Sequence, residues 1–211
     1  GACTLTFMQG DESSAAGLER PPNTARRDGA ETLEGFADLI VRFAANVQPG
    51  QIVAISTEPG KLDLTRAVAD RAYRAGAKFV DVVQFDLHVK RSRILHAAED
   101  TLDYVPPWYG ERVLALGEHR AARIALTGPS MPGLLNDLDP VRAGRDQLPF
   151  LRESAQVVNA RTTNWTAVPC PTQPWAELVH PDLEPAAALA RLWEEVLHMC
   201  RLDEDDPVAA W

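Results

Sequence analysis

The chain has 211 residues, of which 45% are hydrophobic and 24% are charged. These proportions are typical of a globular protein and exclude a collagen-like, coiled-coil or disordered chain. With 30 acidic and 21 basic side chains, the net charge of −9 argues against a nucleic-acid binder or a polybasic membrane surface. At about 150 residues per domain, the length predicts one domain with additional segments.

The N-terminal segment, residues 1–29, mixes Gly, Ser, Pro and charged residues without a hydrophobic period, which predicts a flexible leader. Apolar residues from Leu33 to Val47 then recur every three or four positions, which predicts a helix. Pro49 and Gly50 end this helix, and Ile52–Ile55 follows as a short buried strand.

The alternation of helices and strands continues to the end of the chain. Further strands are predicted over 79–85, 123–127 and 164–168. Further helices are predicted over 64–75, around 94–98, from Pro106-Pro107, over 140–160 with a kink at Pro149, over 189–200, and from Pro207. This order predicts an α/β fold with a mainly parallel sheet and helices on both faces, the doubly wound arrangement.

The number of cysteines and the hydropathy of the chain indicate the compartment in which the protein is expected. Cys3, Cys170 and Cys200 are too few and too scattered for a disulfide framework or a paired-cysteine metal site. They favour a reducing compartment, so we expect a cytoplasmic protein. No run of about 18 apolar residues is present, so no membrane-spanning helix is expected.

The nucleotide-binding and nucleophile motifs are incomplete. The turn Ser56–Lys61 has one glycine where dinucleotide binding needs three, and Leu62 replaces the Ser or Thr of a phosphate-binding loop. Ser130 lacks the second glycine of a nucleophile elbow, and its neighbouring prolines favour a turn. Cys170 between two prolines could be a catalytic thiol, but a buried structural cysteine is favoured. A serine or cysteine hydrolase built on either residue would be active in this chain alone.

The candidate metal ligands do not converge in the sequence. His96 and Glu99 have the spacing of a di-metal helix motif, but no second copy exists. The other histidines are isolated or lie in turns, and the acidic run Asp203–Asp206 lacks the Gly and Glu of a calcium loop. We expect those acids to favour the amino end of a helix at Pro207.

Several short blocks in one order resemble the thermophilic metalloaminopeptidases, the M29 peptidase family. The blocks are Asn46–Val53, Ala75–Lys78, Asn164–Thr166, Pro169–Thr172, Trp175-Ala176, and Trp193 followed by Asp205–Trp211. The resemblance covers the family's N-terminal α/β domain. It implies an α/β domain over 30–203 and, over 204–211, the start of a linker or helix into a C-terminal domain outside this sequence.

Family members remove N-terminal residues from peptides with two divalent metal ions, typically zinc or cobalt, and they form homodimers. Their metal ligands lie in the C-terminal domain. The resemblance therefore assigns no catalytic, cofactor-binding or metal-binding residue to this chain, which we expect to be an inactive part of a longer enzyme. A catalytically silent α/β binding or interaction module derived from the same family is the alternative.

In an open α/β sheet, ligands bind at the carboxyl ends of the strands. The loops predicted there are 56–61, 86–88, 127–131 and 169–173, and we call them the carboxyl-edge loops. One hypothesis is that these loops face a cleft shared with the C-terminal domain and limit access to short peptides, which alanine changes at Glu58, Asp86 and Ser130 would test. The alternative is that these are ordinary surface loops.

Overall fold

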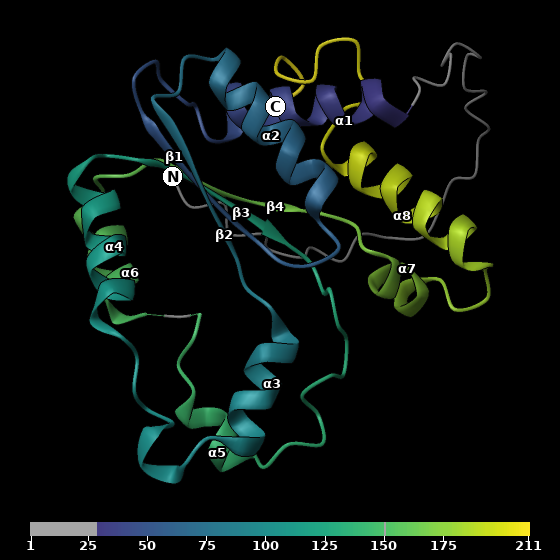
Figure 1. Ribbon diagram of the computed structural model, residues 1–211. Helices are drawn as coiled ribbons and strands as arrows, with labels where there is room; N and C mark the ends of the chain where they lie inside the picture. The colour runs from purple at the N-terminus through teal and green to yellow at the C-terminus, as the bar shows by residue number, and fades with distance from the viewer. Residues whose placement is uncertain (1–28, 150) are drawn as a thin grey trace, which may run out of the picture.

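The computed structural model describes residues 29–149 and 151–211, so the predicted leader lies outside it apart from Gly29. The described residues contain a four-stranded parallel sheet in the order β2-β1-β3-β4 (Figure 1). Its strands are β1 (Ile52–Thr57), β2 (Phe79–Gln84), β3 (Ala122–Thr127) and β4 (Trp165–Pro169). All four predicted strands are confirmed to within two residues at each end.

One face of the sheet carries the main core. It is covered by α1 (Gly29–Asp38), its π-helical continuation η1 (Leu39–Ala44), α2 (Leu62–Arg74) and α8 (Pro185–Met199). Phe36 and Trp193 meet edge to face there, with ring centroids 6.4 Å apart. Val53, Ile55 and Ile124 alternate along β1 and β3 and point into this core, as expected of strands whose side chains alternate between faces.

The opposite face is only partly covered. The helices α4 (Pro107–Glu118) and α6 (Arg152–Ala160) pack against each other beside it. Leu116 of α4 packs on Ala54 near the amino ends of the strands, whereas Ser56 and Ala167 towards the carboxyl ends are exposed. Helices on both faces confirm the predicted doubly wound fold, with one cover incomplete.

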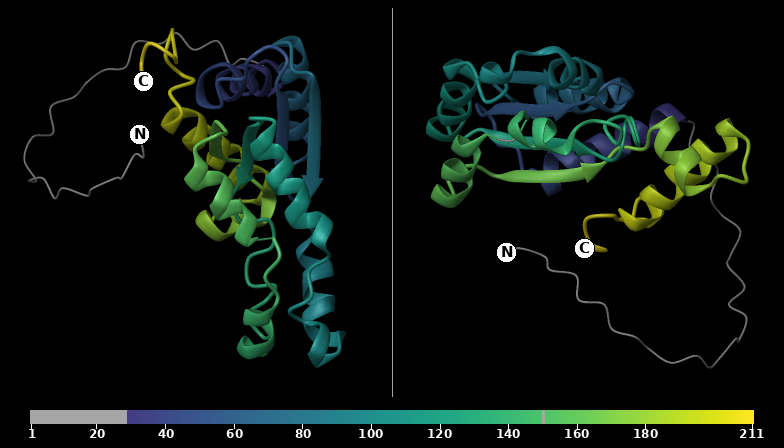
Figure 2. Two further views of the ribbon diagram at one scale, coloured as in Figure 1. Left: turned by 90° about the vertical axis from the view of Figure 1, so that its left-hand side faces the viewer. Right: turned by 90° about the horizontal axis from the view of Figure 1, so that it is seen from below.

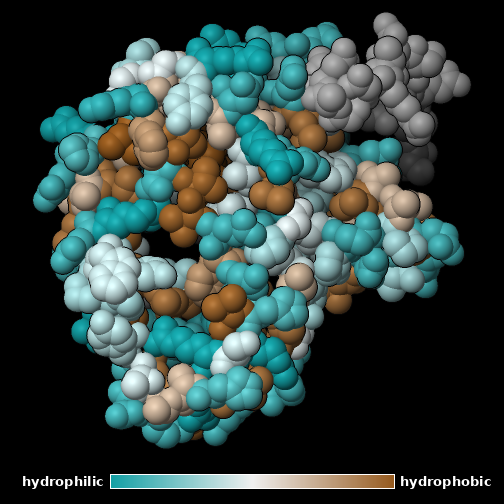
Figure 3. Space-filling model, viewed as in Figure 1, coloured by the Kyte–Doolittle hydropathy of each residue, from teal (hydrophilic) through white to brown (hydrophobic). Residues whose placement is uncertain are grey.

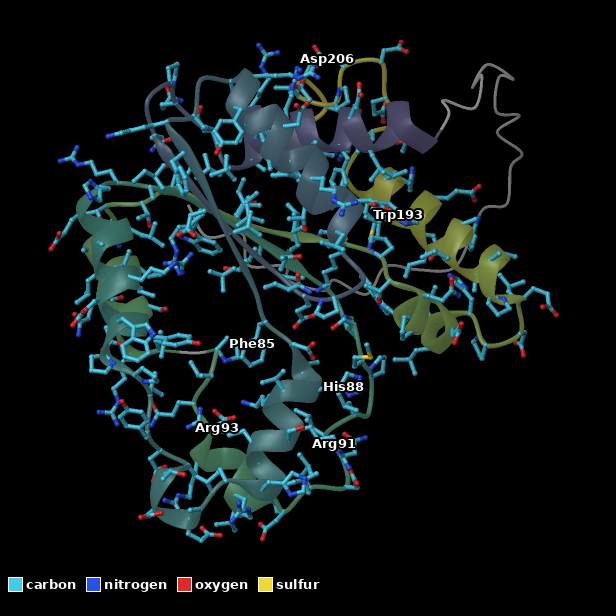
Figure 4. The ribbon with its side chains drawn as sticks, viewed as in Figure 1. Phe85, His88, Arg91, Arg93, Trp193 and Asp206 are labelled. Atoms are coloured by element: carbon cyan, nitrogen blue, oxygen red, sulfur yellow. The ribbon has the colours of Figure 1, made fainter. Side chains whose placement is uncertain are left out.

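An arm formed by residues 86–103 and 131–148 extends away from the sheet (Figure 2). It contains α3 (Leu87–His96), the 3-10 turn η2 (Glu99–Thr101) and α5 (Pro140–Arg145). Arg91 and Arg93 extend from opposite sides of α3 (Figure 4). Arg91 pairs with Asp137 at 2.5 Å, and Arg93 donates to the backbone oxygens of Leu102 and Tyr104 at 2.9 and 2.6 Å. The arm is therefore held largely by ion pairs and arginine-to-carbonyl bonds.

Two helix predictions are wrong in part, and one helix was not predicted. The helix predicted over 140–160 is two helices, α5 and α6, because Asp146 turns into extended backbone before the Leu148-Pro149 peptide. Pro207 starts a turn rather than a helix, with Asp206 accepting bonds from the amides of Val208 and Ala209 at 3.1 Å. The short helix α7 (Gln173–Val179) is not predicted by the sequence pattern.

No helix in the described part of the chain has the length and apolar character needed to cross a membrane.

Candidate functional site

The chain reverses its winding direction at the carboxyl ends of β1 and β3. From β1 the chain leads to α2 on one face, and from β3 it leads to the arm and α6 on the other side. Because the loops after these neighbouring strands diverge, a crevice forms between them, and this is where open α/β sheets bind ligands. Glu58–Lys61 and Gly128–Ser130 are the segments that meet there.

Lys61 fills this crevice. Its side chain is 1% exposed, and its ammonium group donates to Glu58 Oε2 at 2.9 Å, the Leu126 carbonyl at 3.0 Å and the Gly128 carbonyl at 2.8 Å. These three acceptors use all three ammonium protons. Ser130 donates to the same Glu58 oxygen at 2.7 Å. The loops after β1 and β3 are thus tied together by one buried cation.

The loop after β4 joins the same assembly. Thr172 donates to the Pro129 carbonyl at 2.5 Å and also caps α7 by accepting from the Trp175 amide. Gly128 has φ +104°, and a Cβ added to it would lie 2.6 Å from the Trp175 ring. Position 128 therefore needs glycine both for its backbone conformation and for space.

A pocket of about 580 Å³ opens beside these loops and extends between α2 and α8. This volume is in the range of small-molecule sites. Apolar side chains from several helices form most of its wall, and Trp193 faces it from α8 (Figure 4). The lining includes Leu33, Lys61, Ser130, Cys170, Trp193 and Leu197.

Both candidate nucleophiles, Ser130 and Cys170, lie in surroundings typical of structural residues. Ser130 is buried, and its hydroxyl partner is the Glu58 carboxylate, already paired with Lys61, rather than a histidine. Cys170 is 2% exposed, which confirms its expected burial, and desolvation raises the pKa of its thiol to about 11. A thiol with that pKa is almost entirely protonated at neutral pH and is a poor nucleophile.

Glu58, Asp86 and Ser130 of the carboxyl-edge loops are only partly brought together. Glu58 and Ser130 are in contact, whereas Asp86 accepts from the His88 amide at 2.8 Å and caps α3. His96 and Glu99 do not share a helix face, because α3 ends at His96 and Ala97 is extended. Glu99 instead pairs with Arg142 and Arg145 of α5.

The remaining histidines of interest have single carboxylate partners. His180 Nε2 lies 3.1 Å from Glu195, and His198 Nδ1 lies 2.6 Å from Asp203. Within residues 29–149 and 151–211, no group of three or more His, Cys, Asp or Glu side chains could hold a metal ion. The described residues therefore do not fit a metal centre, and no catalytic step through a metal is assigned to them.

Comparison with known proteins shows the family of the chain. The thermophilic metalloprotease (M29) family matches residues 30–211. The chain belongs to the M29 family. Aminopeptidase T of Thermus thermophilus is 37% identical over 182 residues, and aminopeptidase AmpS of Bacillus subtilis is 30% identical over 185 residues. The structure of wild-type AmpT from Thermus thermophilus superposes with a TM-score of 0.72 and 34% identity over 79% of this chain.

These M29 relatives are much longer than the match. The alignments cover 85% and 86% of this chain but only 44% and 45% of the two aminopeptidases, and the superposition covers 42% of the AmpT chain. The chain thus spans less than half the length of the relatives that it matches.

Two of the blocks that resemble the M29 family are neighbours in space. Asn46 adopts a left-handed conformation with φ 47° between η1 and β1. The Asn164 side-chain amide donates to the carbonyl of Asn46 at 3.0 Å, and its oxygen accepts from Gln51 at 3.0 Å. The asparagine before β4 therefore fixes the turn that leads into β1.

Sequence reasoning missed Lys61. Its signal in the sequence is a lone lysine in the turn after the first strand, within an incomplete phosphate-loop motif. Its three acceptors lie up to 67 residues away, so only the fold brings them together.

Proposed function

We propose that this chain is the N-terminal α/β portion of a metal-dependent aminopeptidase that removes N-terminal residues from peptides. The observation that carries the proposal is the M29 match over residues 30–211, together with aminopeptidase relatives up to 37% identical. Residues 30–203 would form the α/β domain, and residues 204–211 would begin the connection to a catalytic domain.

The metal ions, two divalent ions such as zinc or cobalt, would be held by that second domain. They would polarise the scissile carbonyl and supply a hydroxide nucleophile. The carboxyl-edge loops of this chain would border the cleft and restrict it to short peptides. The longer enzyme would act in the cytoplasm, as the few and scattered cysteines favour, and would form a homodimer, as the family resemblance implies.

The experiment is to read the natural coding sequence beyond Trp211 and to express the protein that it encodes. An extended chain with acidic and histidine ligands should release the chromophore from an aminoacyl p-nitroanilide and should lose that activity with a chelator. The 211-residue chain should be inert with or without added zinc or cobalt. A stop codon directly after Trp211 would instead support the silent binding module.

A further inference from the structure

The incompletely covered face of the sheet contains a second, smaller hollow. A pocket of about 280 Å³ lies there, bounded by β1, β3, β4 and α6. Its walls include Ser56, Arg123, Ala125, Val158 and Trp165. Figure 3 shows the molecule hollowed between α4 and the sheet, with hydrophobic residues around the opening. Parallel sheets are normally covered on both faces, whereas the described residues leave part of this face uncovered.

Arg123 is the unusual residue in this hollow. It is the second residue of β3 and is half-buried, yet no ion pair or side-chain hydrogen bond to it forms among the residues that the structure describes. The charged group that acts on Arg123 is Arg112, whose own guanidinium is paired with Asp81 at 2.6 Å. Burial and this second cation lower the pKa of Arg123.

A half-buried guanidinium without an anion costs free energy, because desolvation is not offset by a partner. In a protein with a net charge of −9, two arginines beside one aspartate make a locally positive site. A guanidinium matches a carboxylate with two parallel hydrogen bonds. Beside it, Trp165 is 60% exposed and Val158 is 43% exposed, which provides an apolar surface next to the charge.

We propose that this hollow binds the C-terminal residue of a short peptide. Arg123 takes the terminal carboxylate, and the last side chain of the peptide packs against Trp165 and Val158. Arg123 and Trp165 are paired across β3 and β4, so both point to the same face of the sheet. The inference rests on the proposed function for the identity of the ligand, and it adds recognition of the end opposite to the cleaved bond.

The test is calorimetric titration of the 211-residue chain with the tripeptide Leu-Gly-Phe and with its C-terminal amide. The free acid should bind about ten-fold more tightly, because the amide lacks the charge that Arg123 recognises. Arg123→Gln should remove this preference, and Trp165→Leu should weaken both ligands. Arg66→Gln, the same charge change at a side chain 74% exposed on α2, should preserve it.

Equal affinity for acid and amide, no binding of either, or an unchanged preference in Arg123→Gln would overturn the inference. If Arg123→Gln does not fold, the comparison of acid with amide on the unaltered chain decides alone. The readout is binding without hydrolysis. An inactive extended protein would therefore contradict the proposed function while leaving this result standing, and the reverse also holds.

Discussion

At the scale of single residues, Lys61 combines complete burial with a positive charge. An ammonium group in the protein interior is tolerated only when its protons are all bonded. Glu58 and the carbonyls of Leu126 and Gly128 meet that need, and they belong to two different loops. The same three bonds close the crevice where ligands bind in other open sheets, so Lys61 is a structural residue of the carboxyl edge.

Replacement of this lysine should be costly. Lys61→Met keeps the length of the side chain but removes the cation from the Glu58 carboxylate, which retains the Ser130 hydroxyl as a donor, and removes the ammonium donor from the carbonyls of Leu126 and Gly128. We expect a loss of about 3 kcal/mol in the free energy of unfolding, measured by urea denaturation. Lys78→Met makes the same change at an exposed position and should cost less than about 0.5 kcal/mol. Equal midpoints for the two variants would refute the structural role.

The Cys170 thiol gives a second test at this scale. With a pKa of about 11, only about one thousandth of it is thiolate at pH 8, so alkylation by iodoacetamide should be slow until the protein unfolds. Cys200, which is less buried, should react faster. Because the folded pKa is above the unfolded value, the stabilisation from the protonated thiol is complete below about pH 8.5 and is lost as the pH rises towards 11. Mass spectrometry showing rapid modification of Cys170 in the folded protein would contradict this.

At the scale of elements, α4 and α6 are held together by close contact at glycine. A Cβ added to Gly117 would lie 2.8 Å from Val157 Cγ2, whereas one added to Gly144 in α5 would meet nothing within 4 Å. Both glycines are helical, so propensity alone favours alanine at both. The contact decides between them.

Alanine at these two positions should have opposite effects. Gly117→Ala should destabilise the protein by about 1–2 kcal/mol through overpacking, and Gly144→Ala should stabilise it by about 0.5 kcal/mol. Thermal unfolding of both variants measures this. Val157→Ala in the Gly117→Ala background should be less harmful than in the unaltered chain, and additive effects would contradict the proposed contact.

The arm gives a prediction about local stability. The Asp146 side chain is 1% exposed and lies 3.4 Å from Arg93 and 3.8 Å from Lys90. Asp146→Asn should leave both cations without a carboxylate and speed hydrogen exchange in α3 about ten-fold or more, with little change in β1. Asp137→Asn, at a carboxylate 67% exposed, should have a smaller effect. Equal exchange rates in all three proteins would show that the arm does not depend on Asp146.

The strands were predictable because each is a short apolar run between turn residues. The misassigned helices had signals that pattern reading weighs too little. The helix α5 ends at Arg145, and Asp146 is already extended three residues before Pro149, with its carboxylate beside Lys90 and Arg93 of α3. The helix α7 is too short for a hydrophobic period, and its start depends on Thr172, which also bonds to the loop after β3.

At the scale of the whole molecule, the alternation of strands and helices predicted the doubly wound fold. The family was predicted from short blocks, two of which meet where Asn164 bonds to the turn at Asn46. The sequence could not predict Lys61 or Arg123 as distinctive residues. Lys61 is defined by carbonyls far away in sequence, and Arg123 by the absence of a partner among the described residues on an open face. Both properties exist only after the sheet is assembled.

The most direct measurement uses a chimaera of two proteins. It joins this chain to the part of aminopeptidase T of Thermus thermophilus that lies outside the region that the two share. The turnover of leucine p-nitroanilide by this chimaera is compared with that of the 211-residue chain and with that of the added part alone. We predict that, of these three proteins, only the chimaera is efficiently active, and that a chelator abolishes its activity. A folded but inert chimaera, or metal-stimulated hydrolysis by the 211-residue chain itself, would contradict the proposal that this chain is the non-catalytic portion of an aminopeptidase.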